Sequence, residues 1–542
     1  MTEIVAAGSA QEENPARWWQ SAVLYQIYPR SFQDSDENGV GDLKGILERL
    51  PYLVDLGVEA LWMSPVFPSP MADFGYDISN YTDIAPLFGS LEDFDTLVAA
   101  AHRSGLRVVL DLVPNHTSDR HPWFADSRRS REGPWRDWYI WRDPAPDGGP
   151  PNNWLSEFGG SAWQFDAPTG QYYYHAFLAA QPDLNWRNEK VHAAIHDVMR
   201  FWLRRGIDGF RVDVIWHLIK DAEFRDNPPN PAFVPGRPPH EQLLPLYTTD
   251  RPEVHDLIAG LRRVIDEWDD RVLIGEIYLP IERLVAYYGA GLRGAHLPFN
   301  FALLFTPWKA RDIDRLIAEY EAVLPSGGWP NWVLGNHDHP RLASRIGRDQ
   351  ARIAAMLLLT LRGTPTIYYG EEIGMSQVAI PPARVQDPFE KNVPGIGVGR
   401  DGCRTPMQWT AGRNAGFSIG EPWLPLSADF RRANVESQRA DPASILNLYR
   451  RLIALRRSSP ALTAGAYRPL AAQGDLLLYR REHPDGRVTV ALNLGGEPLS
   501  VQLQHVVPAE RVLLSSHADR DGERITHQLD LRGNEGLIIG AT

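Results

Sequence analysis

The sequence lacks the features that mark secreted and membrane-spanning proteins. Cys403 is the only cysteine among 542 residues, so no disulfide can form within the chain. A chain without disulfides is typical of a reducing compartment, and we expect a cytoplasmic protein. Residues 1–17 are polar and contain no basic stretch followed by an apolar run, so we expect no secretory signal. No apolar run reaches the roughly 20 residues of a transmembrane helix.

The sequence also lacks an excess of basic residues. Lys and Arg number 55 against 68 Asp and Glu, which gives a formal net charge of -13. Nucleic acid and anionic membranes would repel such a chain, so we exclude both as partners and expect a neutral substrate. The 18 tryptophans and 19 tyrosines suit the stacking of sugar rings on aromatic faces, and equally the packing of a large core. The length predicts two or three domains, and we expect a monomer or homodimer.

Short apolar runs alternate along the chain with amphipathic stretches of helical length, which is the pattern of repeated βα units. The expected strands are Ala22–Ile27, Ala60–Met63, Arg107–Leu112, Gly209–Val212, Val272–Ile274, Trp332–Leu334 and Pro365–Tyr368, with a weak eighth near Gly294–Leu297. The expected helices are Leu43–Leu56, Leu91–Ser104, Val191–Arg205 and Val254–Trp268. This repetition favours an α/β fold built on a closed (β/α)8 TIM barrel, with an open doubly wound sheet as the alternative.

Two segments interrupt this alternation. Residues 113–184 are rich in Pro, Gly, Asn and aromatic residues without a helical period, so we expect a loop-rich B domain inserted after the third strand. From about Tyr467 short alternating strands follow one another, which predicts a C-terminal antiparallel β-sandwich. Its clearest strands are Leu476–Arg480, Val488–Leu494 and Arg511–Ser515. The expected domains are residues 1–112 with 185–463 as the catalytic barrel, 113–184 as the B domain and 464–542 as the C-terminal domain.

Three acidic residues follow apolar runs, where TIM barrels place their catalytic groups: Asp213, Glu276 and Asp338. Each of them alone could equally be a helix cap or an ion-pair partner. Together they suit cleavage of a glycosidic bond, which needs one carboxylate to attack or stabilise the anomeric carbon and one carboxylic acid to protonate the leaving oxygen. In retaining enzymes these two groups lie roughly 5 Å apart, a spacing that adjacent barrel strands can provide.

Arg211 lies two residues before Asp213, so both side chains point to the same face of a strand. We expect its guanidinium to keep the Asp213 carboxylate ionised and therefore nucleophilic. Glu276 has to be protonated at neutral pH to act as an acid, which requires less polar or negatively charged surroundings.

Four segments, in this order, resemble the four sequence regions of the α-amylase family of glycoside hydrolases (family 13). They are Asp111–His116, Gly209–Asp213, Gly275–Glu276 and Asn336–Asp338. Further segments resemble the α-glucosidase and oligo-1,6-glucosidase branch of that family, namely Ala22–Phe32, Gly75–Tyr81, Gln181–Trp186 and Arg404–Trp409. The resemblance spans nearly the whole chain and implies a (β/α)8 domain, a B domain after its third strand and a β-sheet C domain.

The resemblance also implies an activity and roles for single residues. Asp213 matches the nucleophile, Glu276 the general acid/base, and Asp338 a third acid that binds sugar hydroxyls and favours the distorted transition state. The implied enzyme is an exo-acting, retaining α-glucosidase that removes terminal glucose from short α-glucosides through a covalent intermediate. The residues that match its glucose subsite are Asp73, Tyr76, His116, Arg211, His337 and Arg404, with Phe158 and Phe177 narrowing the pocket.

Two of these assignments leave alternatives open. Asp73 matches the residue that holds the non-reducing end, and we expect Arg404 to pair with it there, with Arg400 as the alternative. Phe158 and Phe177 equally suit ordinary core packing within the insertion.

A metal site is expected near the start of the chain, over residues 34–42. The candidate ligands are Asp34, Asp36, Asn38, Val40 through its carbonyl, and Asp42. Alternate oxygen ligands with a glycine at the turn resemble the first part of a calcium loop, but Gly45 replaces the usual last glutamate and excludes a helix-pair calcium sensor. The α-glucosidase branch often holds one structural Ca²⁺ or Mg²⁺ in a similar loop, and we expect no organic cofactor. The alternative is an acidic turn capped by its own side chains.

Three residues bear on how far the family pattern applies. Asn115 matches a calcium ligand of many α-amylases, but the α-glucosidase branch often lacks that ion, so no ligand is assigned there. Trp216 stands where many members have a lysine before His217, which supports a different acceptor side. Val214 tends to accompany α-1,6 preference in this branch, and we leave isomaltose-, maltose- and sucrose-type substrates open.

Two other activities compete with hydrolysis. Transglucosylation or glucoside isomerisation shares the covalent glucosyl intermediate and differs only in the acceptor. A catalytically inactive accessory or binding protein on the same fold is the remote alternative, and the presence of all three acids disfavours it.

Overall fold

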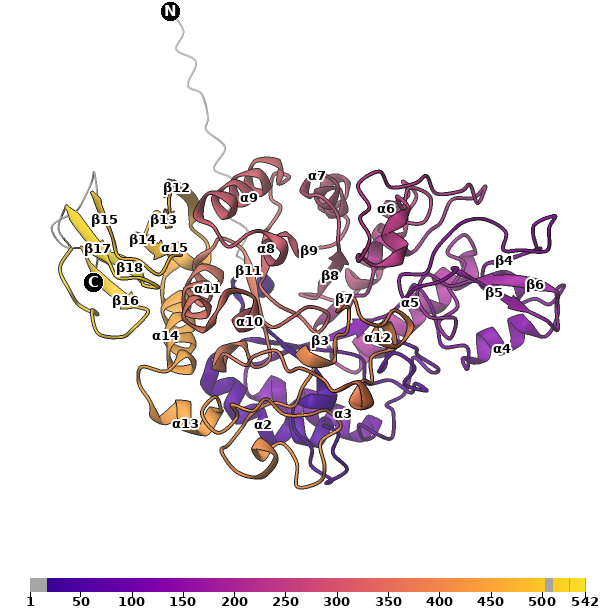
Figure 1. Cartoon of the computed structure of the whole chain (residues 1–542), viewed down its shortest axis with the longest axis horizontal. Helices are drawn as coiled ribbons and strands as arrows, with labels where there is room; N and C mark the ends of the chain where they lie inside the picture. Colours follow the sequence, from indigo (N-terminus) through magenta and orange to yellow (C-terminus); the bar gives the residue numbers. More distant parts are fainter. Residues whose placement is uncertain (1–16, 503–509, 526, 542) are drawn as a thin grey trace, which may run out of the picture.

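The structure, a computed structural model, describes residues 17–502, 510–525 and 527–541. The expectation of no secretory signal concerns residues 1–16, which lie outside the described residues. The centre of the molecule is a sheet of eight parallel strands in the order β10-β11-β1-β2-β3-β7-β8-β9 (Figure 1). They are β1 (Leu24–Ile27), β2 (Ala60–Met63), β3 (Arg107–Leu112), β7 (Gly209–Val212), β8 (Val272–Ile277), β9 (Leu297–Asn300), β10 (Asn331–Val333) and β11 (Thr364–Tyr368).

The outer strands β9 and β10 lie side by side, so the sheet forms a nearly closed barrel. The buried side chain of Asn331 joins them: its Nδ2 donates to the Pro298 carbonyl at 2.5 Å, and its Oδ1 accepts from the Asn300 N–H at 2.7 Å. The amide thus satisfies backbone groups of an edge strand that would otherwise be buried without partners. The TIM-barrel prediction is confirmed, and the open doubly wound sheet is wrong.

The barrel strands are covered on both faces, which explains why they read as short apolar runs without alternation. All six residues of β8 are buried. The expected eighth strand is β9, which begins where the prediction near Gly294–Leu297 ends.

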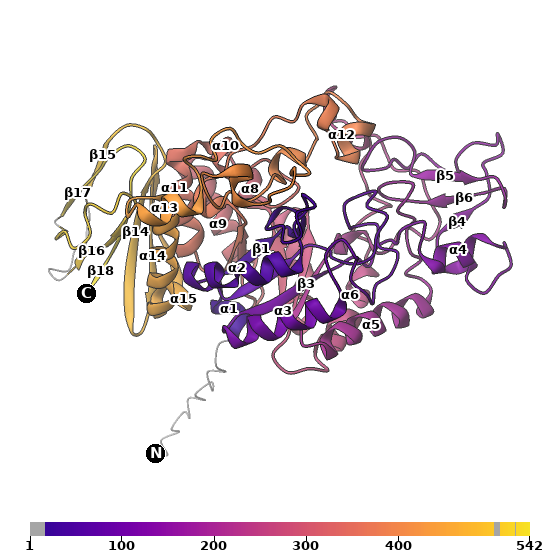
Figure 2. The same cartoon turned by 90° about the horizontal axis from the view of Figure 1, so that it is seen from below.

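Helices surround the barrel (Figures 1 and 2). The longest are α2 (Leu43–Leu56), α3 (Leu91–Arg103), α5 (Glu189–Arg204), α6 (Val254–Ile265), α9 (Ala310–Val323), α11 (Arg348–Thr360) and α14 (Ile445–Ser458). The four predicted helices correspond to α2, α3, α5 and α6, with ends that agree to within about one turn.

Helix α3 shows why these segments are helical. The Ser90 side chain accepts from the Asp93 N–H while the Asp93 carboxylate accepts from the Ser90 N–H, a capping box that satisfies two of the free donors at the helix start. Its buried residues recur at helical spacing on one face, namely Phe94, Leu97, Val98 and Ala101.

The chain between β3 and α5 forms a separate lobe that includes α4 (Pro122–Arg128). Its sheet has the order β4-β6-β5, with β4 (Trp141–Arg142), β5 (Trp163–Asp166) and β6 (Gln171–Tyr174). Figures 1 and 2 place this lobe at the opposite end of the molecule from the C-terminal strands. The domain limits drawn from the sequence stay predictions.

The C-terminal part is an antiparallel sandwich, as predicted. A five-stranded sheet faces a two-stranded one, and apolar residues such as Leu478, Ile539 and Leu529 pack together between them. The strands are β12 (Ala466–Gln473), β13 (Leu476–His483), β14 (Gly486–Asn493), β15 (Leu499–Gln502), β16 (Glu510–Ser515), β17 (Gln528–Leu531) and β18 (Gly536–Ala541). In the described part of the chain, no helix is both long enough and apolar enough to cross a membrane.

Candidate active site

The three predicted acids meet at the carboxyl ends of the barrel strands. Asp213 directly follows β7, Glu276 lies within β8, and Asp338 lies in the segment after β10. All three line one pocket of about 460 Å³, which also receives side chains from the lobe between β3 and α5. Parallel strands that end at the same rim bring residues far apart in sequence to one site.

Arg211 lies at the centre of this cluster. Its Nη1 contacts Asp111 Oδ1 at 2.8 Å and Asp213 Oδ1 at 2.7 Å, and its Nη2 lies 2.8 Å from Glu276 Oε2. The predicted same-face placement of Arg211 and Asp213 is confirmed. That Arg211 keeps Asp213 ionised stays a prediction. Burial and the Glu276 carboxylate raise the pKa of Asp213 well above its usual value, although Arg211 lowers it as expected. The reason is that three buried carboxylates share one guanidinium, which cannot neutralise each of them.

Glu276 is held by backbone as well as by Arg211. Its Oε2 accepts a hydrogen bond from the Val214 N–H at 2.9 Å, and Val214 directly follows Asp213. Burial raises the pKa of Glu276, as a group that must keep a proton requires. Because the pKa values of Asp213 and Glu276 are both raised and the groups share Arg211, they titrate as a pair that retains a proton where isolated carboxyl groups would be ionised.

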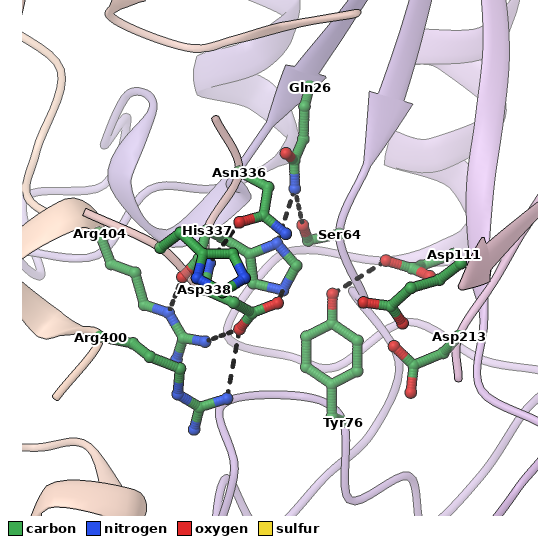
Figure 3. Close-up of polar contacts among 12 residues, drawn as sticks. Gln26, Ser64, Tyr76, Asp111, Asp213, Asn336, His337, Asp338, Arg400 and Arg404 are labelled. Atoms are coloured by element: carbon green, nitrogen blue, oxygen red, sulfur yellow. Dashed lines mark hydrogen bonds and ion pairs between the residues drawn. The ribbon is translucent and has the colours of Figure 1, made fainter. Parts of the chain in front are cut away.

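Asp338 has different surroundings from the other two acids. Its Oδ1 accepts from Arg404 Nη2 at 2.8 Å and from Arg400 Nη1 at 3.3 Å, and its Oδ2 lies 3.3 Å from His337 Nε2 (Figure 3). Burial alone would raise the pKa of Asp338, but the Arg404 and Arg400 guanidiniums hold it well below its usual value. Asp338 is therefore a carboxylate that accepts hydrogen bonds and donates none.

The predicted pairing of Arg404 with Asp73 is wrong, and the alternative, Arg400, makes this contact. Arg400 Nη2 lies 2.7 Å from Asp73 Oδ1 and 2.7 Å from Asp387 Oδ1. Arg404 instead donates to the segment that carries the third acid. The short helix η9 (Asp401–Cys403) lies between the two arginines, so their side chains point in different directions.

His337 and Tyr76 form a stacked pair beside the acids. Their ring centroids are 5.4 Å apart with an angle of 5° between the planes. Gln26 Nε2 donates to His337 Nδ1 at 2.8 Å, which leaves the ring proton on Nε2 towards Asp338. Burial lowers the pKa of His337 well below its usual value, so the ring is neutral. Tyr76 Oη donates to Asp111 Oδ2 at 2.9 Å, and these contacts fix both rings (Figure 3).

His116 and two phenylalanines form a wall of the pocket. The Phe177 ring lies 5.3 Å from the His116 ring and 5.7 Å from the Phe158 ring. The Arg400 guanidinium lies 4.9 Å from the centroid of Phe158. Burial lowers the pKa of His116 to about 4, so its imidazole is neutral at physiological pH. All three rings line the pocket, and the two phenylalanines therefore do more than fill the core of the inserted lobe.

Other residues of the pocket were missed in the sequence, or were noted there only as differences from the family pattern. Trp216 lies 5.6 Å from Tyr278, and Tyr278 lies 6.0 Å from Phe305, between ring centroids. Glu157 of the inserted lobe meets His240 of the connection between β7 and α6 at 3.0 Å. Among these five residues, Trp216 alone carried a signal, because it replaces a residue type common in the family. The others come from loops without a motif.

A buried ammonium joins the inserted lobe to the barrel. Lys220 Nζ donates to Asn115 Oδ1 at 2.8 Å and to Asp183 Oδ2 at 2.5 Å. The Asn115 amide in turn donates to Asp183 Oδ2 at 2.9 Å. A cation of the chain itself thus lies between Asn115 and Asp183, which agrees with leaving Asn115 unassigned as a metal ligand.

The acidic loop near the start of the chain gathers three of its predicted ligands. Asp34, Asp36 and Asp42 each offer a carboxylate oxygen, and these oxygens lie within 4.8 Å of one another. Asp34 and Asp42 are buried, and Asp36 is exposed. Hard oxygen donors grouped in this way fit Ca²⁺ or Mg²⁺.

Hydrogen bonds within the same loop suit the alternative of a self-capped turn. Asp34 Oδ2 accepts from the Gly39 N–H at 2.8 Å, and Asn38 Oδ1 accepts from the Val40 N–H at 2.8 Å. Asp42 also caps the first turn of α2. The geometry is therefore compatible with an ion and with a turn that stabilises itself.

Comparison with known proteins covers most of the chain. Residues 26–465 match the family model described as the α-amylase catalytic domain. The chain is 44% identical to a probable α-glucosidase of Rhizobium meliloti, over 90% of this chain and 91% of the relative. It is 38% identical to an oligo-1,6-glucosidase of Parageobacillus thermoglucosidasius, over 96% of this chain and 98% of the relative. Among solved structures, an α-glucosyl transfer enzyme superposes with a TM-score of 0.91 at 41% identity, over 97% of this chain and 100% of that one.

Proposed function

This chain belongs to the α-amylase family of glycoside hydrolases, and we propose that it is a retaining, exo-acting α-glucosidase of short α-glucosides. The observation that carries the proposal is the contact of one guanidinium, that of Arg211, with both Asp213 and Glu276. Retaining enzymes need two carboxyl groups roughly 5 Å apart, and a bridging guanidinium supports a spacing of that order.

The proposed reaction has two steps. In the first step, Asp213 bonds to the anomeric carbon while the bond to the leaving oxygen breaks and Glu276 gives that oxygen its proton. The proton shared by the pair then has to lie on Glu276 in the substrate complex, with Arg211 balancing the Asp213 carboxylate. In the second step, water attacks the anomeric carbon, the bond to Asp213 breaks, and Glu276 takes the proton from water. Asp338 accepts hydrogen bonds from glucose hydroxyls in both steps.

The Asp73–Arg400 pair supports action at a chain end. Both side chains line the pocket, and Arg400 is also held by Asp387, so the pair is fixed before substrate arrives. A charged pair in a buried place forms strong hydrogen bonds with the hydroxyls of a terminal sugar. We expect it to close the pocket behind one glucose.

Time-resolved proton NMR with isomaltose, maltose and sucrose tests the proposal. We expect α-glucose to appear first from at least one of them, and Asp213→Asn to be inactive. Initial β-glucose would contradict a retaining mechanism, and an active Asp213→Asn would contradict the nucleophile.

Transfer of the glucosyl group to a sugar or alcohol is the second candidate. The aromatic residues Trp216 and Tyr278 in the pocket and the similarity to an α-glucosyl transfer enzyme support it. How well the acceptor site excludes water decides between the two outcomes. The same NMR series at high substrate concentration measures the ratio of new oligosaccharide to free glucose. An inactive accessory role is disfavoured, because the three acids converge on one pocket.

We also propose that the acidic loop holds one structural Ca²⁺ or Mg²⁺. Its ligands would be Asp34, Asp36, Asn38, Asp42 and the carbonyl of Val40, supported by the grouping of the three carboxylates. The ion would offset the repulsion among these acids and fix the loop, with no part in the chemistry. Elemental analysis of the purified protein tests this, and a protein without a stoichiometric divalent ion would contradict it.

We further propose that the enzyme works in the cytoplasm as a monomer or homodimer, without nucleic acid or membrane partners. The single buried cysteine and the net charge of -13 support this. Light scattering of the purified protein and fractionation of the source cells test it.

A further inference from the structure

The pocket contains an ion pair that the mechanism above does not use. Glu157, in the inserted lobe, places its Oε2 3.0 Å from Nε2 of His240, which lies in the connection between β7 and α6. Nδ1 of the same imidazole lies 3.0 Å from the backbone carbonyl oxygen of Glu157. Both residues line the pocket.

The geometry suits an imidazolium at His240. Its two ring nitrogens face a carboxylate oxygen and a carbonyl oxygen, and a ring with a proton on each nitrogen donates to both. Burial opposes this charge, but Glu157 raises the pKa of His240 above its usual value. Burial likewise opposes the charge on Glu157, and His240 lowers the pKa of Glu157 below its usual value. The two groups therefore form a charge-assisted hydrogen bond at neutral pH.

The loops that carry the pair are tied to each other. Asn153 Nδ2 donates to the Asn227 carbonyl at 2.8 Å, and the Asn227 N–H donates to Asn153 Oδ1 at 2.9 Å. Trp154 Nε1 donates to the Arg225 carbonyl at 2.8 Å. The inserted lobe and the connection after β7 thus form one fixed rim, and the pair is oriented before an acceptor binds.

Aromatic side chains belong to the same pocket. Trp216 and Tyr278 line it, and Phe305, which also lines it, is 56% exposed. Phe305 packs edge-on against His339 at 4.9 Å between ring centroids. A large exposed aromatic ring at a pocket is typical of a ligand-binding surface, and such rings stack on the apolar faces of sugars.

The charged groups around this part of the pocket are already paired. Glu157 pairs with His240, and Glu241 pairs with Arg237 at 2.6 Å. Among the described residues that line the pocket, Arg400 is the only Lys or Arg, and it is already bonded to Asp73 and Asp387. A phosphate or carboxylate on the leaving group would therefore find no free cation to bind it.

We propose that Glu157, oriented by His240, is the recognition group of the acceptor side. It binds hydroxyls of neutral sugar leaving groups and acceptors, whereas anionic ones find no free cation there. This inference rests on the proposed α-glucosidase activity. In transfer, the acceptor oxygen bonds to the anomeric carbon, the bond to Asp213 breaks, and the acceptor proton passes to Glu276. Glu157 holds the acceptor for this step, and His240 is a positioning residue.

The test separates formation of the glucosyl-enzyme from its transfer. p-Nitrophenyl α-glucoside is the donor and xylose is the added acceptor. Release of nitrophenol measures formation of the glucosyl-enzyme. The ratio of glucosyl-xylose to glucose measures how the glucosyl-enzyme divides between transfer and hydrolysis. The variants are Glu157→Gln and His240→Gln. The matched controls are Glu223→Gln, in an exposed ion pair with Arg225, and His255→Gln, on α6.

We expect the transfer-to-hydrolysis ratio to fall roughly 10-fold or more in both pocket variants, since hydrogen bonds to charged groups contribute that much. Nitrophenol release at saturating donor should fall by a smaller factor than this ratio, because nitrophenol offers no sugar hydroxyl to Glu157, and the controls should match wild type. Wild type should also cleave maltose far better than maltose phosphorylated on its leaving glucose, and Glu157→Gln should narrow that difference.

An unchanged ratio in Glu157→Gln would overturn the inference. An equal fall of both steps in the two pocket variants would overturn it as well, because lost packing has that effect. Failure of the proposed function is distinguishable, since wild type itself would then release no nitrophenol or would yield β-glucose.

Discussion

Val214 donates its backbone N–H to the Glu276 carboxylate at 2.9 Å from a left-handed conformation, with φ 37° and ψ 46°. A β-branched residue is strained there by on the order of 1–2 kcal/mol. The strained turn directs the Val214 N–H, which follows Asp213 in the chain, at the Glu276 carboxylate. The backbone therefore connects the proposed nucleophile to the proposed acid. The Val214 side chain meanwhile lines the pocket.

The Val214 side chain and its N–H should have separable effects. Val214→Ala keeps the N–H and removes two methyl groups from the pocket wall, so nitrophenol release from an aryl α-glucoside should stay within about threefold. The ratio of kcat/KM for isomaltose to that for maltose should fall if valine at this position favours α-1,6 linkages, as the family resemblance implies. Steady-state kinetics on both disaccharides measure it, and an unchanged ratio would remove Val214 from linkage selection.

Glu276→Gln removes the proton donor and keeps the size of the side chain. Maltose releases a poor leaving group that needs protonation, so its kcat should fall roughly 10²- to 10⁴-fold. Glucosyl-enzyme formation from p-nitrophenyl α-glucoside should fall much less, since nitrophenolate leaves without a proton. Rapid-mixing measurements of nitrophenol release compare the two. Equal losses on both substrates would argue against an acid role.

Loss of the pair at the end of the pocket should affect binding first. Asp73→Asn should raise KM for maltose roughly 10- to 100-fold, the effect of a lost hydrogen bond to a charged group. Arg400→Gln should in addition lower Tm, because it leaves the buried carboxylates of Asp73 and Asp387 unpaired, at a cost of about 3–5 kcal/mol. Arg384→Gln, at a surface ion pair with the exposed Glu421, is the control for Tm. A wild-type KM in Asp73→Asn would contradict the assignment.

Glu371 should make stability depend on pH. Burial raises the pKa of Glu371 to about 8 from an ordinary value of 4.5. Between these pH values the folded protein holds a proton that the unfolded chain has lost, so the free energy of unfolding falls as pH rises and levels off above about 8. Glu371→Gln should therefore lose less Tm than wild type between pH 5.5 and 8. Thermal unfolding at both pH values measures this, with exposed Glu436→Gln as control, and a variant with the full wild-type slope would exclude Glu371 as the cause.

Chelation should reveal the ion of the acidic loop. EDTA should lower Tm, and added Ca²⁺ or Mg²⁺ should restore it in a concentration-dependent way, because the ion binds only the folded loop. Asp36→Asn should respond much less. kcat at 25 °C should not change, since the loop contributes no residue to the pocket lining. An EDTA-insensitive Tm in wild type would favour the self-capped turn.

Sequence reasoning identified most of the barrel because parallel strands buried on both faces appear as apolar runs. It succeeded less well at β9, whose four residues include Pro298 and Asn300 and therefore give a weak strand signal. The three acids were found from their places relative to these runs. Asp213 directly follows one, Glu276 lies within one, and Asp338 belongs to a motif just beyond one.

Side-chain reach and contacts between loops were not predictable in the same way. Spacing alone could not tell whether Arg400 or Arg404 meets Asp73, because the turn of a short helix decides it. Glu157 and His240 lie 83 residues apart in two loops without a motif, so only their folded arrangement brings them together. The sequence shows one arginine beside Asp213 and does not show the carboxylates that share it, so the opposing effects on the pKa of Asp213 could not be weighed from the sequence.

Lys220 makes the architecture of the pocket independent of ion supply. The positive charge between Asn115 and Asp183 belongs to the chain, so dilution, chelators and competing cations cannot remove it, in contrast to the ion proposed for the acidic loop. Burial lowers the pKa of Lys220, while Asp183 opposes this shift. The contact that Lys220 makes with the lobe that supplies Phe158 and Phe177 should therefore persist at any free calcium concentration.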